Sequence, residues 1–112
     1  MIKVTVRYDL AGQPTGFSCR GHAGYQTDGE DIICAAVTTL AATLISSLTD
    51  LLQVEDLTFH LNDGDIGCQL GPSALVEAGD VGQVKLLFQA FELGCRQIAY
   101  SYDGKYVQVE EA

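Results

Sequence analysis

Apolar and polar residues alternate along the first 20 residues of the chain, which is the pattern of half-buried β-strands. From Met1 to Asp9, Ile2, Val4, Val6 and Tyr8 share one side, and the residues between them are polar or charged. A second alternating segment, 15–20, follows the Gly12-Gln13-Pro14 turn signal. The two segments predict a β-hairpin with Phe17 and Cys19 facing the core.

The segment 32–49 carries no charge and has the periodicity of a helix. Its large apolar residues recur every three or four positions, which predicts a helix with one core-facing stripe. They are Ile33, Val37, Leu40, Leu44, Leu48 and Leu51. A segment of this length could also cross a membrane. We expect no insertion, because six of its eighteen residues are Ser or Thr and the flanking Asp31 and Asp50 supply no positive charge to set an orientation.

The second half of the chain again alternates between strand and helix signals. Asn62-Asp63-Gly64 contains the Asp-Gly pair of a tight hairpin, and an apolar stripe that includes Phe88 and Phe91 indicates a second helix. We predict strands at 56–61 and 64–70, a helix at 79–99, a strand at 106–109 after the Asp103-Gly104 turn, and a frayed end at 110–112.

The resulting order, ββαββαβ, indicates an α+β fold with a single small sheet of about five strands and two helices packed on it. No repeat or linker divides the 112 residues, so we expect one domain, 1–112. A small sheet leaves edge strands unpaired, and pairing of these edges or of the apolar helix face makes a homodimer a reasonable expectation.

Composition narrows the classes of partner. Hydrophobic residues make up 47% of the chain and charged residues 19%, which argues against disorder. The net charge is -9 with only six Lys and Arg residues. We therefore expect no nucleic acid and no anionic membrane as partners, and a positively charged partner is favoured.

The four cysteines have no Cys-x-x-Cys spacing, so zinc and disulfide-redox interpretations have little support. We expect no metal and no cofactor. The first residues alternate as a strand and carry Lys3 and Arg7, which is unlike a secretory segment. The expected compartment is the reducing cytoplasm.

The most informative segment chemically is 21–36, where His22 follows a strand and Cys34 lies near the start of a helix. Asp31 is a favoured N-cap, which would make Cys34 the third helical residue. There the helix dipole favours the thiolate, and a protonated His22 would stabilise it as an ion pair, although nearby acidic residues oppose this effect. The N–H groups of Cys34 and Ala35 could then hold an oxyanion.

Each of these residues also has a simpler interpretation. A free cysteine in a helix is usually a small buried hydrophobe, and a histidine at a strand end is usually a surface residue. The acidic residues around Gly29 match no metal-binding loop. His60, which should point outward from its strand, is a reserve candidate for a base. Gly21, Gly24 and Gly29 could make the connecting loop a lid or an ordinary connection.

Taken together, Gly-His-Ala-Gly-Tyr, a Gly-x-Asp-Ile segment and Cys-Ala-Ala-Val-Thr resemble the ribosomal-processing cysteine protease family, often called Prp, over Gly21–Thr38. The resemblance implies a Cys-His dyad, with Cys34 as nucleophile and His22 as general base and proton donor. Gly21, Asp31, Ala35 and Thr38 are further candidates for the substrate site and loop; the family often has serine at the position of Thr38.

The same resemblance implies the substrate. Family members remove the N-terminal extension of a large-subunit ribosomal protein, number twenty-seven in the usual naming, and act as homodimers without a cofactor. Two other classes remain open on the sequence alone. One is a non-catalytic ribosome-assembly binding module, and the other is a thiol-redox protein that uses Cys34.

Overall fold

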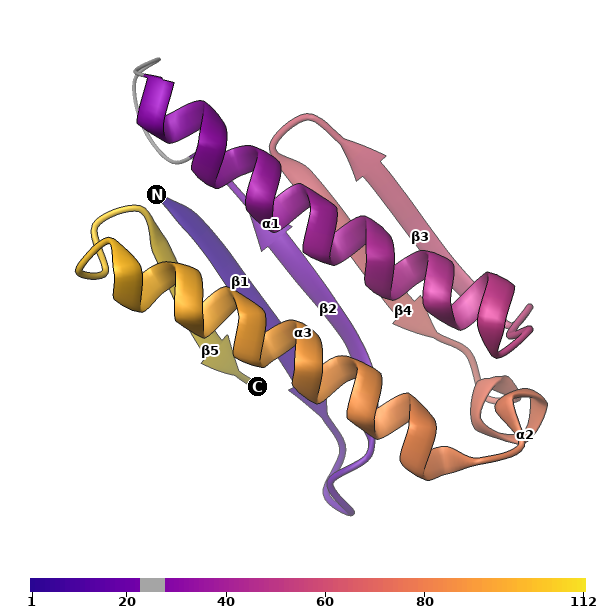
Figure 1. Cartoon of the computed structure of the whole chain (residues 1–112). Helices are drawn as coiled ribbons and strands as arrows, with labels where there is room; N and C mark the ends of the chain where they lie inside the picture. Colours follow the sequence, from indigo (N-terminus) through magenta and orange to yellow (C-terminus); the bar gives the residue numbers. More distant parts are fainter. Residues whose placement is uncertain (23–27) are drawn as a thin grey trace.

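The computed structural model describes the backbone of residues 1–22 and 28–112, and the side chains of 1–22 and 32–112. Its elements, in chain order, are β1 (Ile2–Tyr8), β2 (Pro14–Arg20), α1 (Asp28–Ser46), the π-helical segment η1 (Ser47–Leu51), β3 (Leu57–Asn62), β4 (Asp65–Leu70), α2 (Ala74–Ala78), α3 (Val81–Ser101) and β5 (Val107–Glu111). The strands form one five-stranded sheet (Figure 1). The predicted α+β class is confirmed.

The sheet has the order β3-β4-β2-β1-β5, and both predicted hairpins are present. β1 and β2 pair antiparallel with Val4 opposite Cys19, and β3 and β4 pair with Asn62 opposite Asp65 across the two-residue turn. β2 also pairs antiparallel with β4, whereas β5 runs parallel to β1. The ends of β2 and of the β3–β4 hairpin therefore lie beside each other.

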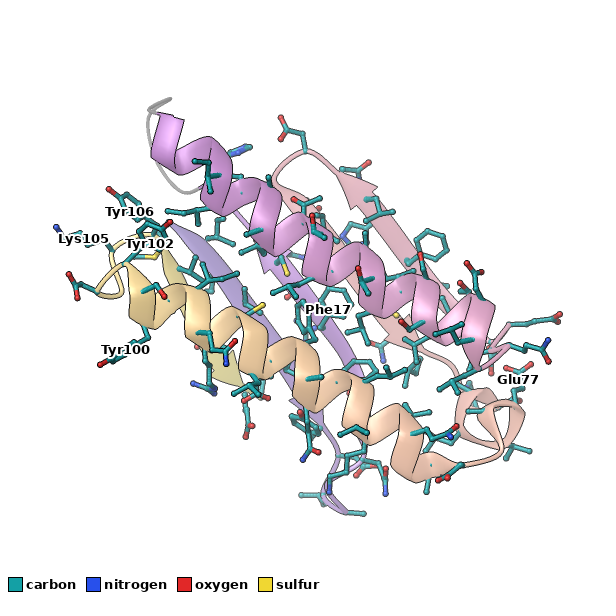
Figure 2. All side chains as sticks on the ribbon, in the orientation of Figure 1. Phe17, Glu77, Tyr100, Tyr102, Lys105 and Tyr106 are labelled. Atoms are coloured by element: carbon teal, nitrogen blue, oxygen red, sulfur yellow. The ribbon has the colours of Figure 1, made fainter. Side chains whose placement is uncertain are left out.

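Helices α1 and α3 lie side by side on one face of this sheet (Figure 1). The alternation of the sequence sends Val4, Val6, Phe17 and Cys19 to that face, where all four are buried. The ring of Phe17 lies between the two helices (Figure 2) and 4.7 Å from the ring of Phe91, centroid to centroid. The core is thus a layer between one sheet face and two helices, as the sequence predicts.

The long apolar helix is a core element of this layer. Residues 32–51 of α1 and η1 meet the length and hydropathy criteria for a membrane-spanning helix. In this fold, however, four members of the predicted stripe are buried against the sheet and α3: Ile33, Val37, Leu44 and Leu48. Leu40 is partly buried, whereas Leu51, predicted to face the core, is 75% exposed. The outer surface of α1 is mostly Ala, Thr and Ser, which suits a helix exposed on one side.

The ends of most elements differ from the prediction by one or more residues, and the helices differ most in ways that affect the site. α1 begins at Asp28 and not at Asp31. Gly79 has a φ of 80° and ends the short helix α2. α3 therefore begins after Asp80, whose carboxylate accepts a hydrogen bond from the Gly82 N–H at 2.9 Å. The sequence does not predict α2, because five residues are too few to show an apolar periodicity.

The chain end at 110–112, expected to fray, is ordered by pairing with β1. β5 extends to Glu111, the Ala112 N–H donates to the Val6 carbonyl at 2.9 Å, and the Tyr8 N–H donates to the Ala112 carbonyl at 3.0 Å. The glutamates resemble a solvated tail in the sequence, but an edge strand tolerates such residues because one side of it faces water.

Candidate active site

His22 lies two residues after the end of β2, and three backbone features fix the chain there. Gly21 has a φ of 100°, and its N–H donates to the carbonyl of Gly64 at 2.9 Å. The ammonium group of Met1 donates to the carbonyl of His22. The end of β2 is therefore tied to the residue that precedes β1 and to the β3–β4 turn. The His22 side chain is 57% exposed, as expected for an accessible base.

Cys34 is half-buried on α1, and it lines the same small cavity as His22. The cavity has a volume of about 50 Å³ and lies at the end of the sheet between α1 and the β3–β4 turn. Gly21 and Thr38, two further candidates from the sequence, also line it, together with Asp63 and Gly64. The fold thus brings Cys34 and His22 to the wall of one cavity, although they come from different parts of the chain.

The helix start changes the local chemistry expected for the sulfur. Because α1 begins at Asp28, Cys34 is its seventh residue and lies in the second turn. Only the first four N–H groups of a helix lack an intrahelical acceptor, and the dipole effect is strongest in the first turn. The prediction that Asp31 caps the helix is therefore wrong. The helix end no longer supports an oxyanion site at the N–H groups of Cys34 and Ala35, because these groups lie beyond the first turn. Asp28, Glu30 and Asp31 are all favourable residues near a helix start, and the helix begins at the first of them.

The remaining sequence candidates lie elsewhere or outside the described residues. Ala35 is exposed and lines a different cavity, of about 660 Å³, between α1 and α3. The backbone of Asp31 belongs to α1, but its side chain lies outside the described residues, as does the proposed lid segment 23–27.

The other three cysteines differ from Cys34 in burial. Desolvation raises the pKa of Cys68 to about 11 and that of Cys95 to about 12, and it also raises the pKa of Cys19. Cys19 borders the same cavity as Cys34, but its side chain is buried. All four thiols are free. Cys34 is therefore the most accessible thiol of the chain.

His60, the reserve candidate for a base, does not share the cavity that Cys34 lines in the described part of the chain. It lies opposite Gly67 in the β3–β4 pair, on the face of the sheet that the helices leave open. Its Nε2 is 3.0 Å from Oδ1 of Asp65. An imidazole on that face is separated from the sulfur by the sheet, so the structure favours His22.

The sequence does not predict that two residues of the cavity wall lie beside His22. The sequence identifies Asp63 and Gly64 only as a hairpin turn, which they are. Their position beside His22 follows from the pairing of β2 with β4, and no local spacing reports such a pairing. Over the side chains that the structure describes, no group of three or more His, Cys, Asp or Glu residues could hold a metal ion.

Comparison with known families gives one match over nearly the whole chain. A family model described as cysteine protease Prp matches residues 1–108. The comparison with curated proteins finds no match.

Solved structures share the fold over the whole chain. The protein SMU.848 from Streptococcus mutans is 31% identical, with a TM-score of 0.79 and coverage of 99% of this chain and 93% of that one. The ribosomal processing protease Prp from S. aureus was solved with a covalently linked product peptide and with a substrate peptide. These two structures are 18% and 17% identical, have TM-scores of 0.80 and 0.81, and match over 100% of both chains.

Proposed function

Because the chain belongs to the cysteine protease Prp family and is a cysteine protease, we propose that it processes a ribosomal protein with Cys34 as nucleophile and His22 as general base and proton donor. The observation that supports the assignment of these two residues is that Cys34, which is half-buried, and His22, which is exposed, line one cavity. The three other thiols are buried and have raised pKa values, which leaves Cys34 as the accessible nucleophile.

The proposed reaction proceeds through an acyl-enzyme. His22 accepts the thiol proton, and the sulfur of Cys34 attacks the carbonyl carbon of the scissile peptide bond. The tetrahedral intermediate collapses as the C–N bond breaks, and His22 gives the proton to the departing amine. Water, activated by His22, then attacks the thioester, which releases the acyl part of the substrate as a carboxylate and restores the thiol.

The proposed substrate is the N-terminal extension of large-subunit ribosomal protein number twenty-seven. Two observations support a ribosomal substrate: the S. aureus protein of the same fold is a ribosomal processing protease solved with a substrate peptide, and this chain has a net charge of -9. Ribosomal proteins bind RNA and are usually basic, so their association with an acidic protein is electrostatically favourable.

The test is cleavage of the precursor followed by mass measurement of the products. We expect removal of the N-terminal extension by the native protein, and loss of cleavage by about 10³-fold or more in Cys34→Ala and in His22→Ala. Circular dichroism should show the native fold in both variants. Full activity in either variant would remove the dyad, and an uncut precursor would remove the substrate.

We also propose that the protein is a cytoplasmic homodimer, since its substrate is a ribosomal protein and its surface offers sites for self-association. β3 is an edge strand of the sheet, and its Phe59 and Leu61 side chains are about half exposed. Light scattering during gel filtration measures the oligomeric state directly. A mass of one chain, 12.0 kDa, at micromolar concentration would contradict the dimer.

A further inference from the structure

The imidazole of His22 rests on a glycine of the β3–β4 turn. A Cβ atom built on Gly64 would lie 2.6 Å from Nε2 of His22, closer than real Cβ contacts, and 3.0 Å from Cε1, which is tighter than most of them. Gly64 also has a φ of 72°, which residues with a side chain rarely adopt. The ring edge that carries Nε2 therefore occupies space that exists only because this residue has no side chain.

The neighbouring residue of the turn faces the other ring nitrogen. Oδ1 of Asp63 lies 4.0 Å from Nδ1 of His22, so the carboxylate is close enough to attract a proton on Nδ1. The Asp63 side chain is 97% exposed, which makes this an ion pair of modest strength that salt will screen. The Gly21–Gly64 hydrogen bond holds the same turn against the end of β2.

We propose that the Asp63-Gly64 turn is the positioning element of the catalytic histidine. Gly64 leaves room for the imidazole, and Asp63 favours the tautomer with the proton on Nδ1, which leaves the lone pair on Nε2, the nitrogen beside Gly64. His22, Gly64 and Cys34 line the same cavity. This inference rests on the proposed function, and it assigns positioning residues to the Cys-His pair. Gly64 lies beside Nε2 but offers it no side-chain group, and Asp63 acts through the other ring nitrogen.

The chain contains a matched control turn. Asp103 and Gly104 form another Asp-Gly turn; Gly104 has a φ of 70°, and nothing lies within 4 Å of a Cβ atom built there. Gly64→Ala and Gly104→Ala should therefore carry a similar backbone strain, but only the first should displace His22. Asp63→Asn and Asp103→Asn likewise remove one charge each. Neither control residue lines the Cys34 cavity.

The glycine arm of the experiment compares kcat and melting temperature. We expect Gly64→Ala to lower kcat by about 10- to 100-fold with little change in KM, because small displacements of a catalytic group have effects of this size. Gly104→Ala should stay within about 2-fold of the native kcat and show a similar shift in melting temperature. Equal kcat values for the two variants would overturn the role of Gly64.

The aspartate arm measures the tautomer of His22 by NMR of the ring nitrogens, with His60→Asn used to assign the signals. We expect the Nδ1–H form to dominate in the native protein and in Asp63→Glu, and to decrease in Asp63→Asn but not in Asp103→Asn. The kcat of Asp63→Asn should fall by about 2- to 5-fold at low salt and by less at high salt. An unchanged tautomer ratio in Asp63→Asn would overturn the role of Asp63.

The two readouts separate this inference from the proposed function. NMR of the imidazole needs no substrate, so it tests the role of Asp63 even if the precursor is not cleaved. A native protein that fails to cut the precursor contradicts the proposed function. A native protein whose activity depends on Cys34 and His22, with Gly64→Ala as active as Gly104→Ala, keeps the function and contradicts the turn.

Discussion

At the scale of single residues, burial determines which of the four cysteine thiols can ionise and react. Thiolates are the reactive form, and desolvation disfavours them. Burial raises the pKa of Cys68 to about 11 and of Cys95 to about 12, so few of these thiols are ionised at neutral pH. Cys34 is only half-buried and borders a cavity that opens beside an exposed imidazole.

We therefore expect iodoacetamide to label Cys34 faster than the other three cysteines at pH 7, by about 10-fold or more. Peptide mapping by mass spectrometry after short exposures measures the four rates. Cys34→Ala serves as the control, since the fast phase should disappear with it. Similar rates at all four positions in the folded protein would show that the thiol has no privileged reactivity.

The residue scale also shows what the sequence could and could not predict about the site. His22 and Cys34 are candidates because each has a recognisable chemistry and both lie within one short motif. Asp63 and Gly64 are about forty residues away from His22, and an Asp-Gly pair reports only a turn. Their role beside the imidazole depends on the pairing of β2 with β4, which is a property of the folded sheet.

At the scale of elements, β1 and α3 are joined by a buried polar contact. The Tyr8 hydroxyl donates to Oε1 of Glu92 at 3.1 Å, and the guanidinium of Arg96 donates to the other oxygen at 3.0 Å. Glu92 is only 8% exposed, and it is paired, as buried carboxylates must be. Burial, followed by the nearby Glu92, raises the pKa of Tyr8 well above its usual value of 10.0.

This contact predicts a loss of stability in alkali. The folded state holds the Tyr8 proton more tightly than the unfolded state, so the contribution of Tyr8 is fully present below pH 10 and is lost as the pH rises above that value. Denaturant unfolding between pH 8 and pH 11 should show this decline. In Tyr8→Phe the decline should be smaller, because the group with the raised pKa is gone. An identical pH dependence in the two proteins would contradict the raised pKa of Tyr8.

Element boundaries are less predictable than element types. Alternation and helical periodicity identify both hairpins and both long helices, since these patterns follow directly from which side chains are buried. The helix start is misplaced because Asp28, Glu30 and Asp31 are all favourable near a helix N-terminus. The strand end at Glu111 escapes prediction because hydrogen bonds to β1, and not apolar side chains, hold it in place.

At the scale of the whole molecule, the net charge of -9 should act on association with a basic substrate. Long-range attraction raises the association rate and is screened by salt. We expect kcat/KM for a full-length basic precursor to fall by several-fold between about 50 mM and 500 mM salt. A short uncharged peptide that contains the cleaved bond is the control, and an equal salt dependence for both substrates would contradict electrostatic steering.

The parallel pair of β1 and β5 has a consequence for biosynthesis. Val4 pairs with Val109, so one side of the first strand acquires its neighbour only after more than a hundred further residues have been translated. Until then the N-terminal hairpin exposes an open edge, which is a template for aggregation. A nascent chain stalled before Val107 should therefore need a chaperone to cover the free edge of β1, whereas in the complete chain β5 pairs with that edge.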